Sequence, residues 1–135
     1  MKAVKKKIKK PFKKTIPAVP EDYFLMLPVN TTAEDIKDAL SSIHTDVEIW
    51  PEVEVLEVIL AEKLSMDIEK ADMDLDDETI LSFAEKENKP SIFYLTLRAE
   101  GYEKGLPLMK RIVQELDGVI VADTEDLTPV IRPEE

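Results

Sequence analysis

The sequence predicts a single α+β domain in which helices pack on one face of a mainly antiparallel sheet. Short strand-like segments recur from residue 23 to residue 131; in some the residues are all apolar, and in others apolar residues alternate with acids. Amphipathic segments typical of helices separate them. The order strand, helix, strand occurs at each end of the chain. This order suggests a ferredoxin-like, split β-α-β fold. The chain has 135 residues, which corresponds to one domain with one core.

The first strand and first helix are predicted from residues 23–44. Residues 23–29 form a continuous apolar run that ends near Pro28, as a buried strand would. Thr32 is placed to cap a helix, which is expected to end near His44. The buried face of that helix follows from apolar residues three and four positions apart: Ile36, Ala39, Leu40 and Ile43.

Residues 47–75 allow two interpretations. Apolar residues alternate with acids from residue 47, which favours a strand, but the phase of this alternation changes at Leu56. A bulge near Pro51 or Glu57 would explain the change, and so would a helix that begins near Glu52. The content of β-branched residues favours a strand up to about Leu60, followed by an edge-like strand within residues 61–75. The sequence does not decide whether residues 52–75 form strands or a helix.

The second helix and the strand after it are more clearly marked. One of the aspartates Asp76 and Asp77 is placed to cap a helix that Pro90 would stop. Residues 91–98 are rich in β-branched and aromatic residues, and they predict a strand that directs Phe93 into the core.

Residues 101–131 predict a turn, a third helix and two further strands. A turn over 101–105 precedes a helix with Pro107 in its first turn and Gly118 as its left-handed C-terminal residue. Residues 119–122 then predict a buried strand, and residues 127–131 a short edge strand.

The charges of the chain are distributed unevenly. Eight of its 18 basic residues are lysines that precede Glu21, so residues 1–20 carry +8 and are expected to form a disordered tail. Residues 21–135 form the acidic domain, which holds ten basic and 29 acidic groups and so carries −19. The lysines expected to act in the tail are Lys5, Lys6, Lys7, Lys9, Lys10, Lys13 and Lys14.

Several classes of chemistry lack the residues that they need. A chain without cysteine can form neither a disulfide nor a thiol nucleophile, and it suits the cytoplasm. Three glycines cannot form a phosphate-binding loop, and the single histidine, His44, lies at a predicted helix end. Residues 72–78 resemble the start of a calcium loop, but Asp77 and Phe83 stand where glycine and glutamate are required. No enzymatic activity, cofactor or metal is therefore expected.

Two hypotheses about function remain. In the first, the acidic body binds a basic protein partner, as inhibitors of the immunity-protein kind do by analogy. In the second, the polybasic tail tethers a regulatory or adaptor domain to anionic lipid or nucleic acid. Trp residues are favoured at interface hot spots, and acids just after a strand often lie in functional loops. The candidate partner-binding residues are Trp50, Glu48, Glu52, Asp72, Asp74, Asp123, Glu125 and Asp126.

Overall fold

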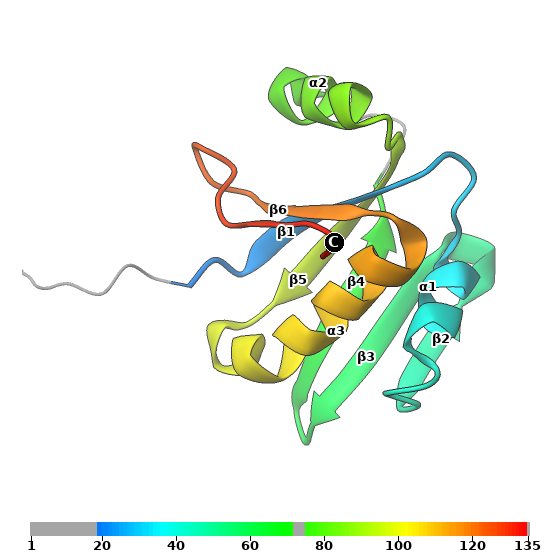
Figure 1. The fold of residues 1–135 in the computed structure, drawn as a ribbon. Coiled ribbons are helices and arrows are strands. Elements are labelled where there is room, and N and C mark those ends of the chain that lie inside the picture. Colours follow the sequence, from blue (N-terminus) through cyan, green and yellow to red (C-terminus); the bar gives the residue numbers. More distant parts are fainter. Residues whose placement is uncertain (1–18, 72–74, 135) are drawn as a thin grey trace, which may run out of the picture.

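The computed structural model describes residues 19–71 and 75–134 and confirms the α+β class (Figure 1). Its strands are β1 (Asp22–Leu27), β2 (Val47–Trp50), β3 (Val55–Ala61), β4 (Leu64–Lys70), β5 (Ser91–Leu97), β6 (Val119–Ala122) and β7 (Val130–Ile131). Its helices are α1 (Ala33–Leu40), α2 (Glu78–Glu87) and α3 (Tyr102–Leu116), with one-turn 3-10 helices η1 (Pro51–Val53) and η2 (Ala99–Gly101). In these two ranges no helix is long and apolar enough to cross a membrane.

The strands form one sheet in the order β2-β3-β4-β5-β1-β6-β7, and all neighbouring strands are antiparallel. Strand β1 lies between β5 and β6, so Leu25 is paired with Phe93 on one side and with Ile120 on the other. Since both neighbours run antiparallel to β1, β5 and β6 are parallel to each other. Helix α3 connects them, which makes β5-α3-β6 a β-α-β unit split by β1.

The two faces of the sheet have separate cores. Along β1, Tyr23, Leu25 and Leu27 point to one face, where they pack with residues of α1 and α3. Phe24 and Met26 point to the other face, where the core includes two residues of α2, Ile80 and Ala84.

A single helical layer therefore does not describe the molecule, contrary to the prediction. Figure 1 shows α1 and α3 next to each other and α2 apart from them at one end of the sheet. The apolar stripe of a helix indicates which side of that helix is buried, but it does not indicate which face of the sheet buries it.

Local capping follows the sequence closely. Thr32 forms a capping box with Asp35 at the start of α1, and the Asp77 carboxylate accepts hydrogen bonds from the first turn of α2. Helix α1 ends at Leu40, earlier than the expected end near His44. His44 Nε2 instead donates a hydrogen bond to the carbonyl oxygen of Ile59, 2.7 Å away, and so ties the α1–β2 loop to β3.

Residues 47–70 form three strands, where the sequence indicated one long strand and an edge strand. The chain reverses after β2 through η1 and Glu54, whose backbone is left-handed with φ 56°. This reversal, rather than a bulge, changes the phase of the alternation. Strand β4 then lies between β3 and β5, so the predicted edge strand is central.

Two glycines have other roles than those predicted. Gly105 lies inside α3, which begins at Tyr102, so Pro107 falls in the helix interior and not in its first turn. Asp117, with φ 55°, is the left-handed residue after α3. Gly118 has no positive φ and is required for space, because a Cβ there would lie 2.5 Å from Leu27 Cδ2 and 3.0 Å from the Met26 carbonyl oxygen.

Candidate functional site

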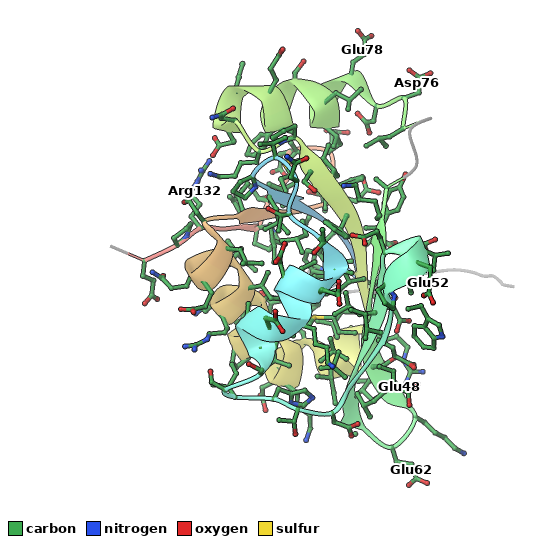
Figure 2. The ribbon with its side chains drawn as sticks, turned by 90° about the vertical axis from the view of Figure 1, so that its right-hand side faces the viewer. Glu48, Glu52, Glu62, Asp76, Glu78 and Arg132 are labelled. Atoms are coloured by element: carbon green, nitrogen blue, oxygen red, sulfur yellow. The ribbon has the colours of Figure 1, made fainter. Side chains whose placement is uncertain are left out.

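Part of the sheet face opposite α1 and α3 is uncovered by the described helices. Helix α2 packs over the β1–β6 side of this face, whereas the side chains of β2, β3 and β4 that point the same way lie outside its core. Figure 2 shows Glu48 and Glu52 on the far side of the strands from α1. We call this surface the open face and define it by Asp22, Glu48, Trp50, Val55, Glu57, Ile59, Asp67, Glu69, Tyr94 and Thr96.

Four carboxylates lie in a line across the open face. Strand register pairs Glu48 with Glu57 and Glu57 with Asp67, then Asp67 with Thr96 and Thr96 with Asp22. Residues paired in this way have Cβ atoms roughly 5 Å apart. We call Glu48, Glu57, Asp67 and Asp22 the acidic row. It contains two like-charge pairs on directly opposed positions, which destabilise a sheet.

No cation neutralises the row within the part of the chain that the structure describes. None of the strand residues that point to the open face is basic. None of the ion pairs among residues 19–71 and 75–134 includes a carboxylate of the row. Asp67 accepts one hydrogen bond, from Ser65 Oγ at 3.0 Å, which is a neutral donor. The row is therefore a line of charge that faces solvent.

A second line of side chains, aromatic or apolar except for Glu69, runs beside the acidic row. The adjacent line of paired residues consists of Trp50, Val55, Glu69, Tyr94 and Phe24. At the β2 end, Trp50 is 44% exposed. At the β1 end, the rings of Tyr94 and Phe24 lie 5.7 Å apart. The open face thus combines negative charge with exposed aromatic surface.

A hollow of about 260 Å³ lies at the β1 end of the open face. The Asp123 backbone N–H donates to the Asp22 carbonyl oxygen at 2.9 Å, which sets Asp123 beside the row. Carboxylates next to aromatic rings suit an ammonium or guanidinium group, which gains both ion pairing and cation–π attraction. The hollow is lined by Asp22, Tyr23, Phe24, Glu69, Tyr94, Leu95, Thr96 and Asp123.

The structure places three of the candidate residues chosen from sequence on or beside the open face, two at its β2 end and one at its β1 end. Glu48 and Trp50 lie on the open face, and Asp123 lines the hollow. Glu52 is exposed in η1, directly after β2.

Two other candidates lie in the β6–β7 connection. Glu125 is exposed there, and Asp126 accepts hydrogen bonds from Thr124 and Thr128 in the same turn. These bonds, those from Thr128 above all, lower the pKa of Asp126, so this carboxylate is engaged in local structure. Asp72 and Asp74 lie outside the described residues, as do all the candidate lysines of residues 1–18.

Sequence reasoning missed Asp22, Glu57, Asp67, Glu69 and Tyr94 as members of one surface. The alternation of acids in residues 47–69 was visible, but the row exists only because three strands fold back on one another. With residues 47–60 taken as one strand, Glu48 and Glu57 would never be opposite each other. Their common face therefore depends on the reversal at residues 51–54.

Within the described ranges, no group of three or more His, Asp or Glu side chains is arranged to hold a metal ion. Comparison of the chain with protein-family models, curated proteins and solved structures finds no match.

Proposed function

We propose that this chain is a non-enzymatic interaction protein whose open face binds a basic segment of a partner protein. The acidic row carries the proposal. Glu48, Glu57 and Asp67 repel one another across neighbouring strands, and a partner that supplies lysine or arginine side chains relieves this repulsion. The formal charge of −19 on residues 21–135 favours the approach of a basic partner over longer distances.

Two features beside the row support a protein partner over a small cation. Trp50 is the only tryptophan and is 44% exposed, and exposed tryptophans commonly anchor protein interfaces. The hollow between Tyr94 and the carboxylates of Asp22, Glu69 and Asp123 has the size and chemistry to take one basic side chain. We propose Trp50 as the anchor at one end and the hollow as the anchor at the other.

We also propose the finer class of the fold and a location for the protein. The order β6-β1-β5-β4, with α1 after β1 and α3 between β5 and β6, supports a ferredoxin-like arrangement extended by strands at both edges. A fold of this kind does not identify a function. The lack of cysteine supports the cytoplasm as the location.

A binding experiment with a defined probe tests the function. The full chain is titrated with a lysine- and arginine-rich peptide, and Trp50 fluorescence and calorimetry report the affinity at low and moderate salt. The triple variant Glu48→Gln, Glu57→Gln, Asp67→Asn is expected to weaken binding at least tenfold, or about 1.4 kcal/mol. The matched control Glu78→Gln, Glu85→Gln, Glu103→Gln removes the same charge from exposed positions of α2 and α3, and it should change affinity less than threefold.

Equal losses in both triple variants would mean that only net charge matters, and the proposal would fail. The same three proteins then serve as baits in a cell extract. The expected result is an identified basic protein retained by the wild type and the control but lost from the face variant. Retention of nucleic acid or lipid vesicles by all three, abolished when the tail lysines are replaced, would instead support the tethered adaptor.

A further inference from the structure

We propose that the lysine-rich segment of residues 2–14 lies across the open face of its own chain, so that a partner must displace it. This inference uses the same face as the proposed function and adds an intramolecular competitor to it. Residues 1–18 lie outside the described part of the chain, so the proposal rests on where that part begins, what charge it presents and how far the segment reaches.

The described chain begins beside the acidic row. The Glu21 carbonyl oxygen accepts a hydrogen bond from the Leu97 N–H at 2.8 Å, and the Glu21 carboxylate accepts one from the Ala99 N–H at 2.7 Å. The Tyr23 hydroxyl donates to the Pro20 carbonyl oxygen at 2.7 Å. These bonds hold the backbone at residues 20–21, and the next residue, Asp22, is the first carboxylate of the row.

The segment is long enough to cross the row. From Asp22 on β1 to Glu48 on β2 the row crosses four strand spacings, or about 19 Å. Lys14 lies five positions before Val19, the first described residue, and five extended steps of the chain reach up to about 17 Å. Residues 5–14 add about 30 Å more, so the lysines can follow the whole row.

Charge favours one direction across the sheet. From β1 toward β2 the open face offers the row together with Glu69 and Trp50, and its strand residues include no lysine or arginine. Toward β6 and β7 the same face is apolar, because Val119 and Val121 belong to the core beneath α2.

A tether also raises the local concentration of the lysines, so that weak exposed ion pairs add up to appreciable occupancy. The segment should therefore run from the hollow toward Glu48. Lys13 and Lys14 then lie near Asp22, Glu69 and Asp123, and Lys5 to Lys7 lie near Glu57 and Glu48.

Zero-length cross-linking of the full chain tests this arrangement. A carbodiimide joins a lysine amine to a carboxylate only when the two are in contact, and mass spectrometry then identifies the linked residues. Equal amounts of unlabelled and ¹⁵N-labelled chain at low concentration distinguish links within one molecule from links between two. We expect links within one molecule, in the stated order along the row, that decline at least fivefold in 0.5 M salt.

Two results would overturn the proposal. One is a set of tail links spread evenly over the acids of α2, α3 and the open face. The other is links that join labelled to unlabelled chains as often as to themselves. The control triple variant at Glu78, Glu85 and Glu103 should keep the pattern. The face triple variant removes three reactive carboxylates, and it should also weaken the remaining links of Lys13 and Lys14 to Asp22, Glu69 and Asp123 while its circular dichroism stays unchanged.

A tail variant separates this inference from the proposed function. Lys5→Gln, Lys6→Gln, Lys7→Gln in the full chain should raise affinity for the basic peptide at least threefold, because the competitor is weakened. Unchanged affinity and absent cross-links, with binding still sensitive to the face variant, would reject the intramolecular contact and leave the function standing. Ordered cross-links with binding insensitive to the face variant would do the reverse.

Discussion

Tyr23 connects the core to the segment before β1 through a single hydroxyl. Its ring is buried among the residues beneath α1 and α3, and its hydroxyl donates to the Pro20 carbonyl oxygen. Burial, followed by the negative charges that Tyr102 and Glu21 bear when ionised, raises the pKa of Tyr23 from 10.0 to about 12. The folded state therefore holds this proton more tightly than the unfolded chain does.

The stability provided by Tyr23 should depend on pH in the alkaline range. Because the folded pKa is raised, this contribution is complete below pH 10 and is lost as pH rises from about 10 to about 12. Absorbance of tyrosinate should show one of the three tyrosines ionising near 12. In urea unfolding, Tyr23→Phe should remove this part of the loss of stability between pH 9 and 11. Ionisation of all three tyrosines in a single step centred near pH 10 would contradict the assignment.

Gly118 allows the end of α3 to approach β1. The alanine variant places a Cβ against the Met26 carbonyl oxygen, a backbone atom that moves only with its strand. Gly118→Ala should therefore cost about 1–3 kcal/mol of unfolding free energy. At Gly101 the nearest atoms are terminal methyl groups of leucines, at 3.0 Å or more, so Gly101→Ala should cost less. Equal losses in chemical denaturation would show that packing at Gly118 is not special.

At the scale of elements, α2 is held differently from the other two helices. Helices α1 and α3 pack on each other and on the larger core, whereas α2 contributes Ile80 and Ala84 to the smaller one. An ion pair links the C-terminal end of α2 to Arg132, which donates to both carboxylate oxygens of Glu87, at 2.5 and 3.2 Å. The Arg132 guanidinium also lies 5.9 Å from the centre of the Phe83 ring.

Loss of this ion pair should loosen α2 selectively. Arg132→Ala should speed hydrogen exchange of α2 amides roughly three- to tenfold, as expected for an exposed bidentate pair, and leave α3 amides unchanged. The hydrogen bond from Arg132 lowers the pKa of Glu87, so the stabilisation is present above the ordinary value of 4.5 and declines as pH falls below it. Uniform acceleration across both helices would indicate global destabilisation instead.

The sequence predicts elements well where their causes are local. The side chains of Thr32 and Asp77 cap helices by accepting hydrogen bonds from backbone N–H groups two or three residues later. The alternation in residues 91–97 likewise shows that Phe93 is buried. The reversal after β2 has no such local cause, since Glu54 takes a left-handed backbone that glycine would favour. Its carboxylate accepts the Ala33 N–H at 2.9 Å, a contact between residues 21 positions apart.

The candidate site could be predicted only in part, for the same reason. Exposure of Trp50 and Glu48 follows from their alternation with Val47 and Ile49, which are partly buried. Membership of Glu57 and Asp67 in one row depends on register between three strands, which alternation alone does not set. The position of α2 on the second face likewise depends on a distant core.

For the molecule as a whole, electrostatic repulsion lowers stability. Residues 21–135 carry −19, and in the acidic row Glu57 lies between Glu48 and Asp67. Exposed like charges at such distances repel at low salt and are screened at high salt. Repulsion between the charges of the open face therefore lowers the free energy of unfolding of the free protein.

Neutralising the centre of the row should stabilise the fold. Glu57→Gln should raise the free energy of unfolding by about 0.5 kcal/mol at 20 mM salt, and the gain should vanish at 1 M salt. The control Glu103→Gln removes a charge from the first turn of α3, where an acid is favourable, and so should give no gain. Thermal unfolding at both salt concentrations distinguishes the two. A gain from Glu57→Gln that persists at 1 M salt would exclude repulsion as its cause.

The position of β1 in the sheet has a consequence for synthesis of the protein. Both strands that pair with β1 lie far along the chain, since Asp22 is opposite Thr96 and Met26 is opposite Val119. At roughly 5–20 residues per second, a ribosome exposes β1 for several seconds before β5 is complete. During that interval the apolar residues of β1 have no strand to pair with. The lysines that precede β1 repel the lysines of other nascent chains. We therefore expect replacement of these lysines by glutamine to increase aggregation of the protein during synthesis.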